Sequence, residues 1–154
     1  REALKLGAAA VGYTIYVGSA HESTMLQEFE AIESRAHAKG IPVVVWIYPR
    51  GKSVEKKKPS ELMAYSARIA LEIGADIVKL QYNGNQKDLS WAVKSAGKTK
   101  VVVAGGIKKD EKTLLKQVKD IMQTGAIGLA IGRNVWQHPN PLEITKKIRE
   151  IIWR

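Results

Sequence analysis

The chain has 154 residues, which fits one compact domain, and its hydrophobic content of 45% is enough for a buried core. No stretch approaches the ~18 consecutive apolar residues of a membrane span, so we expect no membrane partner. The absence of cysteine excludes a disulfide framework and best fits a reducing, cytoplasmic location. The net charge of +10 is mixed with acidic residues at helical spacing and is not interleaved with aromatic residues. It therefore predicts solvated helix faces and no nucleic-acid partner.

Short runs rich in β-branched residues alternate with longer amphipathic runs along the chain. The segment from Arg1 to Leu6 has the pattern of the end of a helix. The predicted strands that follow are Ala9–Val17, Pro42–Tyr48, Asp76–Tyr82, Lys100–Gly105 and Ile127–Gly132. The predicted helices between and after them are His21–Lys39, Glu61–Ile73, Lys87–Ala96, Glu111–Thr124 and Pro141–Trp153.

Local signals mark the ends of several predicted helices. A glycine follows three of them, in the stretches AKGIP, EIGAD and QTGAIG. Glycine adopts the left-handed conformation that stops a helix without a Cβ clash. At the other end, we expect Ser60, directly before ELMA, to cap the second predicted helix.

Five strand–helix units, with strands that are apolar on both faces, predict an α/β fold with a parallel sheet covered by helices. No GxGxxG stretch follows the first strand, which disfavours a doubly wound dinucleotide-binding sheet. The unusual residues all lie at the C-terminal ends of the strands, which form the catalytic face of a (β/α)8 TIM barrel. Five units are too few to close such a barrel. We therefore expect residues 1–154 to form a single partial TIM-barrel domain that supplies about strands 4–8 and their helices.

Lys79 lies inside the apolar run DIVKLQY, where an ammonium group is costly. Strand alternation places Lys79 and Gln81 on one face, and the apolar Val78 and Leu80 on the face that suits the helix layer. A lysine that points into the barrel loses hydration, which favours its neutral amine, a nucleophile. A lysine paired with a carboxylate across the barrel is the alternative. Its partner would lie outside the five predicted strands.

Trp46 and Tyr48 share one face of the preceding strand, in the stretch VVVWIYPRG. We expect Tyr48 to lie on the strand adjacent to Lys79 and at the same level of the barrel, where its hydroxyl can act as general acid or base. Two aromatic residues that merely fill the barrel are the alternative. Arg50 ends this strand and faces either a substrate or solvent.

Gly105-Gly106 and Gly132-Arg133 end the last two predicted strands. In TIM barrels these two loops commonly form a phosphate site from backbone N–H groups, because glycine lets the anion approach closely. Arg133 adds a positive charge, and the stretch RNVWQ can open a short helix whose N-terminus also favours an anion. The three histidines are far apart and lack the spacing of metal ligands, so we expect no metal.

Over its whole length, the sequence resembles the last five βα units of the archaeal-type class I fructose-bisphosphate aldolases. The matching stretches are GYTIYVGS, VVWIYPRG, DIVKLQYNG, SWAVKSAGK, VVAGG and AIGRNVWQ. The resemblance implies reversible cleavage of fructose 1,6-bisphosphate to dihydroxyacetone phosphate and glyceraldehyde 3-phosphate through a lysine Schiff base, without a metal or other cofactor. This is a lyase reaction of glycolysis and gluconeogenesis. Related synthases that make an amino-dideoxy-heptulosonate share the YPRG, lysine and GRN stretches, and Trp46 favours the aldolase.

The resemblance also assigns roles to particular residues. Lys79 matches the Schiff-base lysine, and Tyr48 matches the tyrosine that transfers protons. The positions that match substrate contacts are Trp46, Arg50, Leu80 and Gln81, and those that match the phosphate loops are Ala104, Gly105, Gly106, Gly132 and Arg133. Two positions depart from the family pattern, since Ala104 lacks the hydroxyl that some relatives carry and Ile107 stands where a proline is common.

Partners follow from the same resemblance. It implies a phosphorylated sugar as substrate, together with either a homo-oligomer, which is a decamer in the family, or a complementary N-terminal part of the barrel. The family's first three strands would carry further substrate contacts and an aspartate that assists the lysine chemistry. A non-catalytic fragment that only binds phosphate is the remaining alternative.

Overall fold

The computed structural model describes residues 2–153 and contains a five-stranded parallel sheet. The strands pair in chain order, β1-β2-β3-β4-β5, so no reversal of strand order divides the sheet as it does in a doubly wound fold. The chain therefore forms part of a TIM barrel, as the sequence predicts. The strands are β1 (Val11–Val17), β2 (Val43–Pro49), β3 (Ile77–Gln81), β4 (Lys100–Ala104) and β5 (Gly128–Ala130).

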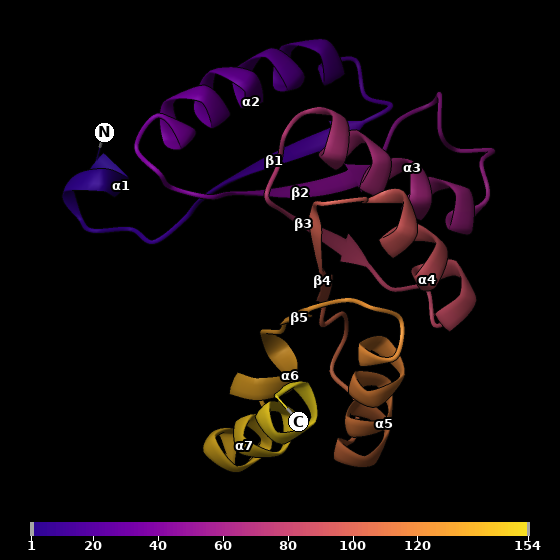
Figure 1. Ribbon diagram of the computed structural model, residues 1–154. Helices are drawn as coiled ribbons and strands as arrows, with labels where there is room; N and C mark the ends of the chain where they lie inside the picture. Colours follow the sequence, from indigo (N-terminus) through magenta and orange to yellow (C-terminus); the bar gives the residue numbers. More distant parts are fainter. Residues whose placement is uncertain (1, 154) are drawn as a thin grey trace.

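Helices follow every strand and lie along the outer side of the curved sheet (Figure 1). The predicted helices are confirmed with shifts of one to two residues at most of their ends. Arg1, the first residue of the predicted initial segment, lies outside the described residues. Within residues 2–153 no helix has both the length and the apolar character of a membrane span. The helices are α1 (Glu2–Lys5), α2 (Glu22–His37), α3 (Pro59–Glu72), α4 (Gln86–Ser95), α5 (Glu111–Met122), α6 (Arg133–Trp136) and α7 (Pro141–Ile152).

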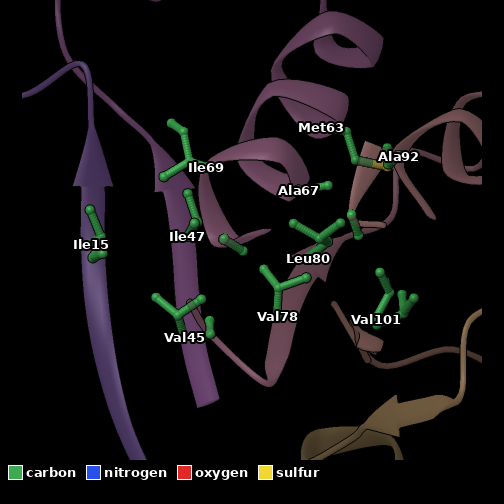
Figure 2. Close-up of a cluster of buried hydrophobic side chains, with 14 of the residues drawn as sticks. Ile15, Val45, Ile47, Met63, Ala67, Ile69, Val78, Leu80, Ala92 and Val101 are labelled. Carbon is green, nitrogen blue, oxygen red and sulfur yellow. The ribbon is translucent and has the colours of Figure 1, made fainter. Parts of the chain in front are cut away.

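Strict alternation along the strands separates the two faces of the sheet. In β2, Val43, Val45 and Ile47 are at most 1% exposed, whereas the residues between them are half-buried. In β3, Val78 and Leu80 are 0% and 2% exposed. Figure 2 shows Val45, Val78 and Leu80 pointing from neighbouring strands toward α3, which supplies residues such as Ala67. Each such burial contributes about 1.5–3 kcal/mol, so the helix-facing side holds the core and leaves the opposite, concave side free for polar residues.

The helix ends follow the local signals in all but one case. Gly40, Gly74 and Gly125 adopt φ values of +67°, +79° and +89° after α2, α3 and α5, which confirms the three glycine stops. The prediction that Ser60 caps α3 is wrong. The helix begins at Pro59, one residue earlier, because a proline has the fixed φ of the first helical position and needs no N–H partner there.

A second apolar cluster joins the last two long helices. Leu114 and Val118 of α5 pack against Ile144 and Ile148 of α7. The ammonium of Lys147 lies 2.8 Å from Glu111 and 2.6 Å from Glu143. These two carboxylates raise the pKa of Lys147 above its ordinary value. These contacts hold α5 and α7 together. α5 follows β4, and α7 follows the short helix α6 after β5.

At the amino-terminal end of the sheet, Asp76 connects α2 with β2. Its Oδ2 accepts a hydrogen bond from the Val43 N–H at 2.7 Å and lies 2.8 Å from Nε2 of His37. Burial acts to raise the pKa of Asp76, but the Val43 N–H and the His37 ring outweigh it and lower that pKa. The Asp76 carboxylate, with Glu33 at 2.7 Å from the other ring nitrogen, raises the pKa of His37.

We expect Asp76→Asn to lower the free energy of unfolding by about 1 kcal/mol, since the site is partly exposed. The contribution of Asp76 is present above the unfolded-state pKa of about 3.9 and is lost as the pH falls through its lowered folded-state pKa. The contribution of His37 is present below about pH 6.5 and is lost as the pH rises through its raised pKa. Urea unfolding should therefore show a larger difference between wild type and variant at about pH 5.5 than at about pH 9.

Glu72→Gln provides the matched control, because Glu72 forms a solvent-exposed ion pair with Arg68 on α3. Exposed pairs of this kind contribute little to stability. A loss for Asp76→Asn that is the same at both pH values would contradict the assigned role of the His37 pair.

Candidate active site

Lys79 and Trp46 lie side by side on the concave face of the sheet. They are register partners on β3 and β2, and Thr14 of β1 is the register partner of Trp46. Paired residues of parallel strands point to the same face, so the three side chains form one layer. The Nζ of Lys79 lies 5.9 Å from the centroid of the Trp46 ring, a cation–π contact. Lys79 is half-buried, and the ion pairs formed within residues 2–153 do not include it.

Tyr48 lies on the strand adjacent to Lys79, as predicted, and along the strands it lies nearer the carboxyl end of the sheet than Lys79. That the two share a level along the barrel axis stays a prediction, because barrel strands tilt against that axis. The register places Trp46 opposite Lys79, and Tyr48 follows two residues later on the same face, a rise of about 6.6 Å. The partner of Tyr48 on β1 is Tyr16, with ring centroids 6.1 Å apart and an interplanar angle of 31°. Along the strands, Tyr48 therefore lies nearer the mouth than the lysine layer.

Arg50 covers this pair of tyrosines from the exposed end of β2. Its Cζ lies 5.6 Å from the ring centroids of both Tyr16 and Tyr48, and its backbone N–H donates to the Val17 carbonyl at 2.8 Å. The side chain is solvent-exposed yet oriented over the two rings. Tyr16 is a site residue that the sequence reasoning missed. The alternation of Thr14 and Tyr16 in GYTIYVGS was the signal that could have identified it.

The two residues after Lys79 lie on opposite faces. Leu80 is 2% exposed and packs in the helix-facing core beside Met63 and Ala67 (Figure 2). Only its backbone is therefore accessible to a ligand on the concave face. Gln81 is exposed at the end of β3, two residues beyond Lys79 and on the same face.

The end of β4 contacts the end of β5 directly. The Gly105 N–H donates to the Ala130 carbonyl at 3.2 Å, and a Cβ built on Gly105 would lie 2.9 Å from the side chain of Ile131. Gly105 is therefore required for this close approach. Gly106 has a φ of +67°, and a Cβ at this position would meet nothing within 4 Å. Its backbone is accessible from solvent and has the left-handed conformation that favours glycine.

The loop after β5 forms the second half of this region. α6 begins at Arg133, directly after Gly132, as the stretch RNVWQ predicted. A Cβ on Gly132 would overlap the indole ring of Trp136, so the ring packs on the bare backbone. In the part of the chain that the structure describes, the backbone N–H groups of Gly106 and Arg133 have no protein acceptor. Unpaired N–H groups of this kind suit an anion.

The residues predicted to form the phosphate loops lie at or just after the ends of β4 and β5, the two strands that follow that of Lys79. Ala104 is the register partner of Gln81 on β3 and of Ala130 on β5. The two glycine loops therefore start one and two strands away from the strand of Lys79. Asn134, a buried residue that the sequence reasoning missed, hydrogen-bonds across these loops. Among residues 2–153, no three His, Asp or Glu side chains come together in a group that would hold a metal ion.

Comparison with known proteins identifies the family to which the chain belongs. The model of the DeoC/LacD family of aldolases matches residues 1–138, so the chain belongs to this family. The class 1 fructose-bisphosphate aldolase of Thermoproteus tenax is 48% identical over 153 residues, and that of Halobacterium salinarum is 42% identical over 151 residues. These alignments cover 99% and 98% of this chain but 58% and 57% of the relatives. The chain thus spans somewhat more than half the length of these relatives.

A solved structure gives the same result. An archaeal fructose-1,6-bisphosphate aldolase, whose catalytic lysine is covalently bound to the carbinolamine intermediate of its substrate, matches this chain with a TM-score of 0.94. The two sequences are 46% identical, and the match covers 99% of this chain and 61% of that chain. The five βα units therefore have the arrangement of an aldolase barrel.

Gly12 determines how the indole of Trp46 lies beside Lys79. A Cβ built on Gly12 would overlap the outer edge of the Trp46 ring, so the ring lies directly on the backbone of β1. We expect Gly12→Ala to displace the indole and change its contact with the Lys79 ammonium. The measurement is the NMR shift of the Trp46 indole N–H, assigned with Trp46→Phe.

Gly128→Ala is the matched control for this variant. Gly128 also lies in a strand, but a Cβ there would meet nothing within 4 Å. The Trp46 signal should stay in place in Gly128→Ala and move in Gly12→Ala. An unmoved signal in Gly12→Ala would show that β1 does not determine the indole position.

Proposed function

We propose that this chain forms the larger part of a class I fructose-bisphosphate aldolase, which reversibly cleaves fructose 1,6-bisphosphate to dihydroxyacetone phosphate and glyceraldehyde 3-phosphate. The observation that carries the proposal is the position of Lys79 on the concave face, in contact with Trp46. The relative whose catalytic lysine is bound to a carbinolamine supports a covalent role for this lysine.

Lys79 is the nucleophile of the proposed reaction. Its neutral amine attacks the ketone carbon of the sugar and forms a carbinolamine, which loses water to give an imine. The positive imine withdraws the electron pair released when the neighbouring C–C bond breaks, and the aldehyde product leaves. Protonation of the resulting enamine and hydrolysis of the imine release the second product and restore the amine. The lysine supplies the electron sink, and the proposed reaction needs no metal or other cofactor.

Tyr48 is the proposed proton carrier. Protons move when the carbinolamine loses water and when the substrate hydroxyl next to the breaking bond becomes a carbonyl. Along the strands, Tyr48 lies on the mouth side of Lys79, where the bound sugar would extend. Arg50, Trp46 and Gln81 line the same face and are the proposed substrate contacts, with Leu80 restricted to its backbone.

The proposed phosphate site lies at the ends of β4 and β5. It consists of Ala104, Gly105 and Gly106 in one loop and of Gly132 and Arg133 in the other. The contact between the two loops, the unpaired N–H groups of Gly106 and Arg133, and the guanidinium charge support it. Ala104 contributes no hydroxyl, so we assign the hydrogen bonds to backbone groups and Arg133.

The completing part of the barrel is a further proposal. Within residues 2–153, β1 and β5 each have a neighbouring strand on one side only, and the relatives are longer than this chain. We propose that a complementary N-terminal part of the barrel pairs with these edges and supplies the remaining strands. Assembly into a homo-oligomer, such as the decamer of the family, stays a prediction, as does a cytoplasmic location.

Two alternatives to the aldolase follow from the sequence. The relatives from Thermoproteus tenax and Halobacterium salinarum are fructose-bisphosphate aldolases by name, which favours the aldolase over a heptulosonate synthase. A non-catalytic phosphate-binding fragment differs from the aldolase in one measurable respect, the ability of Lys79 to form an imine.

We expect the chain to form a covalent adduct with dihydroxyacetone phosphate that sodium borohydride reduces to a stable amine on Lys79, detected by peptide mass spectrometry. Lys79→Arg keeps the positive charge but removes the amine, so the adduct should disappear. Lys100→Arg, at the exposed first position of β4, is the control and should leave the adduct unchanged. An adduct that persists in Lys79→Arg would place the nucleophile elsewhere, and no adduct in wild type would favour the non-catalytic alternative.

In the complete barrel, we expect Tyr48→Phe to reduce turnover by about 10²–10⁴-fold, the usual contribution of general acid–base catalysis. The melting temperature should change little, because the phenyl ring keeps its packing beside Tyr16. Tyr65→Phe, on the exposed face of α3, is the control for loss of a tyrosine hydroxyl. A reduction below about threefold would assign Tyr48 to packing and leave proton transfer to another group.

A further inference from the structure

Asn134 is the buried polar residue closest to the proposed phosphate loops, and it is only 2% exposed. Its Nδ2 donates to the Gly105 carbonyl at 3.0 Å and to the Ile107 carbonyl at 2.9 Å. Its Oδ1 accepts from the Lys109 N–H at 2.8 Å. The side chain thus forms three hydrogen bonds to the segment between β4 and α5, which is distant in sequence.

The backbone of the segment from Gly105 to Lys109 has few other anchors. The side chains of Lys108 and Lys109 also donate hydrogen bonds, to the Gln137 carbonyl at 2.7 Å and to Gln117. At the start of the segment, the Gly105 N–H donates to β5, and at its end Asp110 caps α5 by accepting from Thr113 at 2.9 Å. Gly106 and Ile107 are exposed between these points. The bonds of Asn134 are therefore the main constraint on the backbone in the middle of this segment.

The geometry requires an amide at this position. Two backbone carbonyls need donors and one backbone N–H needs an acceptor, and a neutral amide side chain offers both. A carboxylate would place negative charge against two carbonyl oxygens, and an apolar residue would leave three buried or partly buried groups without this partner. Asn134 also belongs to α6, the helix that carries Arg133, so it joins both loops of the proposed phosphate site.

We propose that Asn134 is a positioning residue, which holds the β4–α5 loop against α6 so that the free N–H groups of Gly106 and Arg133 converge on one phosphate group. This inference rests on the proposed function, because it takes these loops as the phosphate site. Asn134 itself does not contact the anion. It satisfies the carbonyls of the loop and thereby fixes the orientation of the peptide groups between Gly105 and Lys109.

The test uses Asn134→Asp, which keeps the size of the side chain and the acceptor for Lys109 but loses both donors. Asn85→Ala is the matched control. Asn85 caps α4 by accepting from the Lys87 N–H at 2.9 Å and forms no hydrogen bond with either glycine loop, so its loss tests for a general destabilisation. The backbone mobility of Gly106 and Ile107 is measured by NMR relaxation, and inorganic phosphate is titrated into each protein.

We expect the mobility of Gly106 and Ile107 to rise in Asn134→Asp, and the Kd for phosphate to increase by about tenfold or more for the lost hydrogen bonds. Asn85→Ala should change neither. As a second measurement, borohydride trapping compares dihydroxyacetone phosphate with unphosphorylated dihydroxyacetone. Asn134→Asp should lose the preference for the phosphorylated ligand, whereas a general folding defect lowers both reactions equally.

Unchanged loop mobility and unchanged phosphate affinity in Asn134→Asp would overturn the positioning role. A greater mobility with an unchanged affinity would also overturn it, because the loop geometry would then not govern binding. If the wild type bound no phosphate although the loop became mobile in Asn134→Asp, the phosphate site of the proposed function would fail, and Asn134 would hold the loop for another purpose.

Discussion

The two-residue period of the β-strand is the constraint on which the rest of this molecule depends. A strand buried against helices on one side needs an apolar residue at every second position, and Val78 and Leu80 meet this need in β3. The intervening positions are released from that requirement, so Lys79 can stand between them at no cost to the core. The same separation in β2 places Trp46 and Tyr48 opposite the buried valines. A half-buried lysine and a well-packed core are compatible here because they occupy different faces.

The candidate site also depends on glycine residues, because they allow close contacts that a side chain would prevent. The Trp46 ring lies on the backbone at Gly12, and the end of β4 meets Ile131 at Gly105. Gly51 plays a similar part at the mouth, because a Cβ there would overlap the Gly18 carbonyl. Each contact brings the ends of neighbouring strands closer together than Cβ atoms would permit. The concave face is consequently shaped as much by the absence of side chains as by their presence.

Much of this arrangement follows from local sequence, and the remainder depends on contacts between distant segments. Runs such as VVVWIY and IVKLQ define strands and faces because alternation is a property of one strand alone. The level of Tyr48 relative to Lys79 depends on the stagger between two strands, which neither strand encodes by itself. The position of Arg50 over Tyr16 and the bonds of Asn134 to the β4–α5 loop join residues far apart in the chain. At α3 the hydroxyl of Ser60 is the predicted start signal, whereas the helix begins at Pro59, whose fixed φ suits the first helical position.

The strand order also has a consequence for how the chain acquires its structure. Every strand after β1 pairs with the strand that precedes it in the sequence. Each of these strands therefore has a partner that has already been synthesised. The loss of chain entropy on loop closure is therefore divided into small, similar steps, one for each βα unit. During synthesis, β2 can pair with β1 while the downstream units are still in the ribosome, and each later unit adds to an edge that already exists. The strand order thus allows the sheet to form in the direction of translation, from β1 to β5.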